Sequence, residues 1–178
     1  METETVTIQL TPEDVHDCTE FAHIYQRTCI ENNQKQKYGL FGKEQNFRNT
    51  LQGYLGERAV GKYFDYETIY TPYNLTIPDV LGYEVRTVKY ENAILITHPD
   101  DTKYFIADYI CVSLNHATML ATLKGWSGIK RCNVPANWIE RINWHTACYG
   151  MHESQLWDIQ TLPATKELIA HQRSKQTV

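Results

Sequence analysis

The chain has 178 residues, 42% of them hydrophobic and 21% charged, which suits one domain with a real core and is short for two. No apolar run approaches the length of a membrane span, so the composition excludes a membrane-spanning protein. The net charge of −4 counts against a protein that binds nucleic acid by nonspecific attraction, although the carboxylates of a nuclease would themselves lower the charge.

A helix is predicted over residues 12–32. Thr11 suits the N-cap, Pro12 the first helical position, and Glu13 and Asp14 the first turn. Apolar side chains then recur at three- and four-residue steps and give the helix a face toward a core: Val15, Cys18, Phe21, Ala22, Tyr25 and Cys29. The polar stretch 31–39 that follows is expected to be a loop or a mobile arm.

A second helix is predicted over residues 44–64. Its apolar stripe consists of Phe47, Leu51, Tyr54, Leu55, Ala59, Tyr63 and Phe64. Gly53, Gly56 and Gly61 interrupt it, and each costs roughly 1 kcal/mol relative to Ala inside a helix. Their periodic placement predicts that this helix packs closely against another backbone.

From residue 68 the pattern changes to short β-runs separated by turn residues. The runs cover residues 68–73, 79–88, 92–97, 104–113 and 118–126. Two helices followed by five strands predict an α+β fold with one mixed five-stranded sheet. Residues 134–163 are expected to form a short helix with irregular packing, within a single domain over residues 1–165. Residues 166–178 are expected to be a fraying helix that ends in a flexible tail.

Cysteine usage predicts reduced thiols, because the five cysteines are scattered and contain no C-x-x-C pair. The start Met1-Glu2-Thr3-Glu4 lacks the basic and apolar regions of a signal peptide, so a cytoplasmic location is expected. His145 and Cys148, with Cys132, leave a small zinc site open as an alternative. Their spacing fits no common structural zinc pattern, so core cysteines and a surface histidine are the favoured explanation.

The segment from Pro78 to Thr87 carries the most informative pattern. Asp79 and Glu84 lie five residues apart, and Arg86 follows two positions after Glu84. Side chains alternate along a strand, so Glu84 and Arg86 are expected on one face, and a bend at Leu81–Gly82 would bring Asp79 beside them. Two hard oxygen ligands next to a fixed cation suit Mg²⁺ or Mn²⁺ chemistry on a phosphodiester. The alternative is an ordinary solvated strand with an incidental ion pair.

Three short motifs occur in a familiar order along the chain: Gly56-Glu57-Arg58-Ala59 on the second predicted helix, then Pro78-Asp79, then Glu84-Val85-Arg86. With these motifs the chain resembles the PD-(D/E)xK nuclease superfamily, especially its small phage-type members. The resemblance covers about residues 44–131, up to a strand that ends near Gly125-Trp126. It implies a restriction-endonuclease-like core, a twisted mixed sheet flanked by helices, with the helix over residues 12–32 packed on it.

The resemblance implies that Asp79 and Glu84 bind Mg²⁺ or Mn²⁺ together with the Val85 carbonyl. Glu57 would hold a second metal or orient water. Independently of the resemblance, Asp108 stands among apolar residues of the run 104–113, where a carboxylate needs solvent or a partner, and it is a candidate to support the metal ligands. Arg86 stands where the family usually has Lys. Arginine stays charged, so Arg86 would stabilise negative charge at phosphorus but is a poor general base. The implied activity is metal-dependent cleavage of DNA, in the host cytoplasm if a phage encodes the protein.

Basic and aromatic residues mix in the stretch 34–48, as in a groove that follows phosphates. The DNA-binding candidates are Lys35, Lys37, Lys43, Arg48 and Lys89. A solvated loop is the alternative for this stretch. Arg86 and the acidic net charge favour a second reading, in which a nuclease fold without catalysis serves as a binding, inhibitory or assembly protein with a protein partner. Twelve tyrosines and four tryptophans are compatible with a homo-oligomer.

Overall fold

The computed structural model describes residues 6–32, 43–68, 70, 78–89, 94–99, 107–140 and 147–176. Within these ranges the fold is α+β, with helices α1 (Pro12–Glu31), α2 (Lys43–Tyr63), α3 (Ile129–Cys132) and α4 (Lys166–Gln176). The strands are β1 (Val6–Gln9), β2 (Tyr83–Val88), β3 (Ile94–Thr97), β4 (Asp108–Asn115), β5 (Leu120–Gly128), β6 (Trp138–Ile139) and β7 (Cys148–His152). None of the described helices is both long and apolar enough to cross a membrane.

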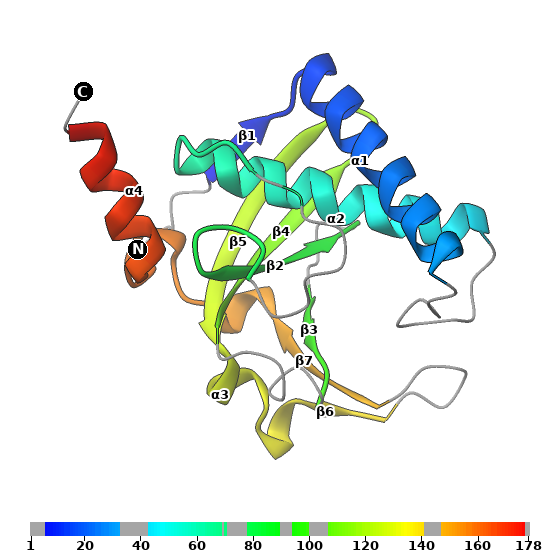
Figure 1. Cartoon of the computed structure of the whole chain (residues 1–178). Helices are drawn as coiled ribbons and strands as arrows, with labels where there is room; N and C mark the ends of the chain where they lie inside the picture. Colours follow the sequence, from blue (N-terminus) through cyan, green and yellow to red (C-terminus); the bar gives the residue numbers. More distant parts are fainter. Residues whose placement is uncertain are drawn as a thin grey trace.

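The strands form two sheets. The four-stranded sheet has the order β1-β5-β4-β2, in which β2 runs parallel to β4 and the other neighbours are antiparallel. The three-stranded sheet has the order β3-β7-β6 and is antiparallel. Figure 1 shows β3, β6 and β7 on the side of the larger sheet away from α1 and α2.

The prediction of one five-stranded sheet is therefore wrong, although the α+β class and the mixed strand directions hold. The run 92–97 contributes β3, which pairs with β7 rather than joining the larger sheet. The predicted run 68–73 has no strand in its described residues, 68 and 70, and its remainder lies outside the described ranges. The fourth strand of the larger sheet is instead β1, which was not predicted although its four residues alternate apolar and polar side chains and alternate in burial.

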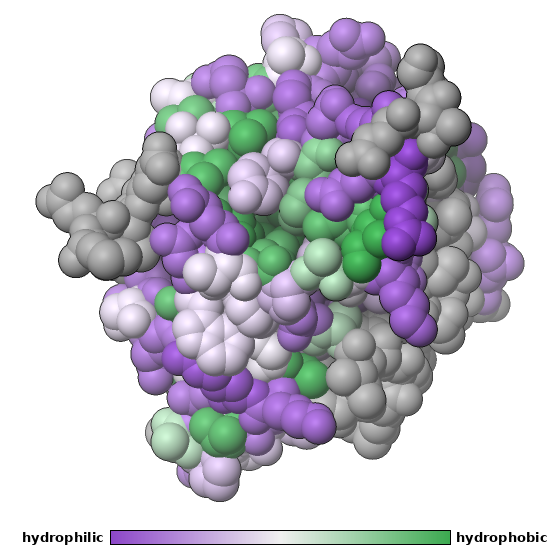
Figure 2. Space-filling view, turned by 90° about the vertical axis from the view of Figure 1, so that its left-hand side faces the viewer, coloured by the Kyte–Doolittle hydropathy of each residue, from purple (hydrophilic) through white to green (hydrophobic). Residues whose placement is uncertain are grey.

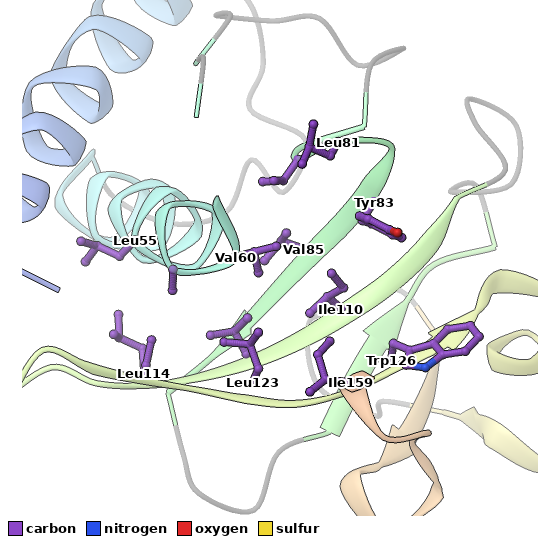
Figure 3. Packing of buried hydrophobic residues seen from close by; sticks show 14 of the residues in the cluster. Leu55, Val60, Leu81, Tyr83, Val85, Ile110, Leu114, Leu123, Trp126 and Ile159 are labelled. Carbon is purple, nitrogen blue, oxygen red and sulfur yellow. The ribbon is translucent and has the colours of Figure 1, made fainter. Parts of the chain in front are cut away.

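Helix α2 covers one face of the larger sheet and forms the main core with it. Leu55 and Val60 of α2 are fully buried, and Val85 of β2 points toward them (Figure 3). A smaller cluster fills the opposite face, between the two sheets: Leu95, Tyr109, Cys111, Ile129, Cys132 and Met151. Side chains alternate along β2 and β4, so every second side chain packs toward α2 and the others face the smaller sheet. Val85 belongs to the set that packs toward α2.

The carboxyl-terminal residues 166–176, where the sequence suggested a fraying helix and a flexible tail, form helix α4. Leu168 of α4 is 6% exposed and belongs to the main core, whereas Ile169 remains 38% exposed. Figure 2 shows the side of the molecule on which α4 lies in Figure 1, and hydrophobic residues gather in a hollow near the middle of that face.

Close packing of α2 explains two of its three glycines. A Cβ at Gly56 would overlap the Thr87 side chain of β2, and one at Gly61 would lie within 2.8 Å of the Tyr66 carbonyl oxygen. A Cβ at Gly53 would meet only Glu57 Oε1, at 4.0 Å. The predicted close approach is confirmed at Gly56 and Gly61 and is wrong at Gly53.

Helices α1 and α2 pack against each other, and Asp14 fastens the first turn of α1 to the last turn of α2. Its carboxylate accepts the backbone N–H of Thr11 at 2.8 Å, which completes a capping box, and Lys62 Nζ donates to it at 2.6 Å. Burial raises the pKa of Asp14, but the hydrogen bonds from Lys62 and Thr11 outweigh it and hold the pKa below its ordinary value of 3.8.

We expect Gly56→Ala to destabilise the protein by about 1–3 kcal/mol, because the added methyl group forces α2 away from β2. Gly53→Ala is the matched control on the same helix, and we expect it to stabilise the fold by up to about 1 kcal/mol because the site is open. Urea unfolding followed by circular dichroism measures both. Equal effects of the two substitutions would show that the contact with Thr87 does not limit the helix position.

We expect Asp14→Asn to lower the free energy of unfolding at pH 7 by about 1–2 kcal/mol, because a charge-assisted hydrogen bond is lost. The pKa of Asp14 is lower in the folded state, so its contribution is present above pH 4 and is lost as the pH falls through the folded pKa. The stability gap between wild type and variant should therefore begin to narrow as the pH falls to about 4 and should close below the folded pKa of Asp14. Asp17→Asn is the control, since Asp17 is more exposed and lies 3.6 Å from its cation, Arg58. A gap that does not depend on pH would contradict the assignment.

Candidate active site

A tight turn brings Asp79 beside β2. Val80 and Tyr83 pair through two backbone hydrogen bonds of 3.0 and 2.9 Å, and the two residues between them have φ values of +48° (Leu81) and +88° (Gly82). Positive φ at both central positions is the geometry of a two-residue hairpin turn. The chain reverses there, and the Val85 N–H donates to Asp79 Oδ2 at 2.8 Å. The predicted bend at Leu81–Gly82 is confirmed.

Glu84 and Arg86 extend from one face of β2, as the alternation predicts. Arg86 Nη1 lies 3.4 Å from Glu84 Oε2. The Arg86 guanidinium carbon is 5.2 Å from the centre of the Tyr109 ring on the neighbouring strand β4. Glu84 is only 3% exposed, so its carboxylate is a buried charge with Arg86 as a neighbouring cation. Val85, between them, faces the opposite layer and is part of the main core.

Glu57 reaches the same site from α2. The close contact of Gly56 with Thr87 fixes this turn of the helix against β2, and Glu57 follows directly in the sequence. Burial, followed by repulsion from Asp79 and Glu84, raises the pKa of Glu57 well above its ordinary value, while Arg86 opposes the shift. Three carboxylates and one guanidinium are therefore close enough to feel one another's charge.

The pKa of Asp79 is also raised. Burial is the largest cause, and the hydrogen bond from the Val85 N–H and the positive charge of Arg86 act in the opposite direction. Asp79 and Glu57 are half-buried and Glu84 is buried, so the region holds three acids that are partly or fully removed from water. Such a region favours a bound cation, because the cation offsets the free-energy cost of desolvating the carboxylates and reduces the repulsion between them.

The donor chemistry fits Mg²⁺ or Mn²⁺, but the side chains do not form a finished metal cage. Within the described residues, no three His, Cys, Asp or Glu side chains are grouped closely enough to hold a metal ion together. Mg²⁺ does not require such a cage, because it commonly binds one or two carboxylates and keeps several water molecules. Asp79 and Glu84, adjacent across the turn, are the two residues that would hold it.

The residues predicted to bind DNA fall into two groups. Lys35 and Lys37 lie outside the described residues. Lys43 and Arg48 are exposed on the first turns of α2, where Arg48 forms an ion pair with Glu44, and Lys89 is exposed just after β2. Of the three candidates that the structure describes, only Lys89 adjoins the strand that carries Glu84 and Arg86.

Asp108 begins β4 opposite Tyr83 and Gly128, and burial raises its pKa. The charges that shift the pKa of Glu57 are those of Asp79, Glu84 and Arg86, and Asp108 is not among them. The zinc alternative is not supported by the described residues, which contain no group of three metal-ligating side chains and in which Cys132 and Cys148 are buried. His145 lies outside the described residues.

Sequence reasoning missed Gln52 and His116. Gln52 lies one turn before Gly56 on α2, and its side-chain amide donates to the Thr87 carbonyl at 2.8 Å. His116 Nε2, in the turn after β4, lies 3.4 Å from Gln52 Oε1. Burial and the nearby Lys89 lower the pKa of His116. The spacing Gln52–Gly56, one helical turn, was the available signal that Gln52 faces β2.

Comparison with protein-family models, curated proteins and solved structures finds no match to this chain. A functional assignment therefore depends on the chemistry of the site itself, since a fold class alone does not determine function.

We expect Arg86→Gln to destabilise the fold by about 1–3 kcal/mol, because it removes a cation from beside the buried Glu84. Arg48→Gln is the matched control, since it removes the same charge from an exposed i,i+4 pair worth only about 0.3–0.5 kcal/mol. Chemical unfolding at pH 7 compares the two variants. If both variants lose the same small free energy of unfolding, the pair of Glu84 and Arg86 does not stabilise the fold more than an exposed ion pair does.

Proposed function

We propose that the protein is a metal-dependent phosphodiesterase that acts on DNA. One observation carries the proposal: the Leu81–Gly82 turn places Asp79 next to Glu84 and Arg86, and α2 adds Glu57 to the same poorly solvated region. The same four residues form the motif pattern through which the sequence resembles the PD-(D/E)xK nucleases. Sequence pattern and geometry thus support the same assignment by separate routes.

In this proposal each side chain has a chemical task. Asp79 and Glu84 hold Mg²⁺ or Mn²⁺, which when bound supplies a polarised water and neutralises charge at phosphorus. The Val85 N–H holds one Asp79 oxygen in place, so that carboxylate is oriented before substrate arrives. Glu57 orients water through its carboxylate.

Arg86 stabilises the negative charge that grows on the phosphoryl oxygens. Its guanidinium stays protonated, so it does not accept the proton from water. Its position above the Tyr109 ring and beside Glu84 limits its motion, which preserves its orientation during the reaction.

We expect purified protein to cleave plasmid or linear DNA in Mg²⁺ or Mn²⁺, and we expect Asp79→Asn and Glu84→Gln each to reduce the rate by roughly 100-fold or more. EDTA should abolish cleavage. Glu44→Gln is the matched control, because it removes an exposed carboxylate from the start of α2 and should leave the rate unchanged. An RNA substrate in parallel separates deoxyribonuclease from ribonuclease activity. Equal rates of DNA cleavage by wild type and Asp79→Asn would indicate a contaminating nuclease and would contradict the proposal.

A second function is favoured by Arg86 and by the lack of a closed metal cage among the described residues. The same fold would then bind a protein partner without cleaving DNA. The same experiment separates the two functions. A wild type that is folded by circular dichroism, cuts no DNA and binds no Mn²⁺ at millimolar concentration in calorimetry favours the second function.

A further inference from the structure

The carboxyl-terminal segment contacts the turn that positions Asp79. The Thr165 hydroxyl donates to the Leu81 carbonyl and accepts the N–H of Leu168 at 3.0 Å, so it joins the turn to the first residues of α4. Just before it, the Pro163 carbonyl accepts the Tyr83 hydroxyl at 2.5 Å. Both bonds connect residues about 80 positions apart in the sequence, and both end within the four-residue unit Val80–Tyr83.

The turn is also enclosed sterically. A Cβ at Gly82 would lie 2.8 Å from Glu167 Oε2 and 3.0 Å from the Thr165 side chain, so residues 165–167 fill the space outside the turn. Leu81 adopts a positive φ, which is uncommon for a residue with a branched side chain. A conformation of this kind persists only when surrounding contacts hold it. Thr165 supplies such a contact directly, at the Leu81 carbonyl.

The far end of α4 is attached to the residues that directly follow α2. His171 Nε2 lies 3.1 Å from the Asp65 carbonyl oxygen, and Lys175 Nζ donates to the same oxygen at 2.6 Å and to the Asp65 carboxylate. The His171 ring also packs edge-on against Tyr66, at 5.2 Å between centres. Between its two ends α4 buries Leu168 in the core. The helix therefore bridges the turn that carries Asp79 and the end of the helix that carries Glu57.

We propose that residues 163–175 form a carboxyl-terminal clamp and that Thr165 is its positioning residue. The clamp holds the Leu81–Gly82 turn in the conformation in which Asp79 accepts the Val85 N–H beside Glu84. Thr165 touches none of the candidate ligands and acts through the turn. The effect on catalysis rests on the proposed phosphodiesterase function, whereas the effect on the Asp79–Val85 hydrogen bond does not.

The first test reads that hydrogen bond by NMR, without substrate or metal. In Thr165→Val, we expect the Val85 amide proton shift to move toward its value in Asp79→Asn and its hydrogen exchange to accelerate about 10-fold relative to the Val112 amide of β4. Thr165→Ser keeps the hydroxyl and should match wild type. Thr161→Val is the control, because the Thr161 hydroxyl bonds Trp126 and Asp158 but not the turn.

A global loss of stability would accelerate Val112 as much as Val85, so the ratio separates positioning from simple destabilisation. If Thr165→Val does not fold, Tyr83→Phe removes only the hydroxyl that bonds Pro163 and provides a milder version of the same test. A Val85 amide that keeps its wild-type shift and exchange ratio in these variants overturns the proposal.

The second test measures DNA cleavage. Thr165→Val should lower kcat about 10-fold with little change in KM, and Thr165→Ser should restore it, because the clamp orients Asp79 rather than binding DNA. A wild type without cleavage would reject the phosphodiesterase function and leave the NMR test of the clamp intact. Normal cleavage by Thr165→Val, together with a displaced Val85 amide, would overturn the catalytic part of the clamp.

Discussion

The backbone pairing of Val80 with Tyr83 is the interaction on which the candidate site depends. It closes a turn of only two residues, so the chain that enters the turn, including Asp79, runs beside the strand that carries Glu84. With a longer loop, only side-chain contacts would determine where Asp79 lies relative to Glu84. Because the pairing is made by backbone atoms, it sets the spacing of the two carboxylates before their own charges contribute.

Those charges oppose the arrangement. Burial raises the pKa values of both Glu57 and Asp79, and repulsion from Asp79 and Glu84 raises that of Glu57 further. Packing provides the opposing force: Gly56 lets α2 approach Thr87, and Val85 is buried under α2 on the other face of β2. A group of acids held together against its own repulsion by a hydrophobic layer is typical of sites built to receive a cation or a substrate.

The local signals in the sequence predicted α1 and α2 well, whereas α3 was missed and the helix expected within 134–163 is replaced there by β6, β7 and short 3-10 turns. Thr11-Pro12 and the apolar spacing gave α1 to within one residue of its observed end, and the predicted range 44–64 matches α2 with a shift of one residue. The turn at Leu81–Gly82 was equally readable, because glycine after a strand-like run marks a reversal. Each of these features depends on residues that are close together in the chain.

The long-range arrangement was not readable in the same way. Nothing within Ile94–Thr97 says that it pairs with residues 148–152 rather than with β2, since short β-runs carry no information about their partners. The two-residue strand β6 has no periodic signal at all. Helix α4 was expected to fray because its sequence is polar, yet its contacts with Leu81 and Asp65 come from elements about 80 to 110 residues away.

The parallel pairing of β2 with β4 has a consequence for how the protein folds. Parallel neighbours cannot be joined by a tight turn, and here the connection between them contains β3, which belongs to the other sheet. The α1–α2 contacts and the β4–β5 hairpin are local, and such contacts form early in folding. Pairing of β2, which carries Glu84 and Arg86, with β4 requires closure of a connection of about twenty residues, and this closure has an entropic cost. We therefore expect β2 to join the larger sheet after these local contacts have formed.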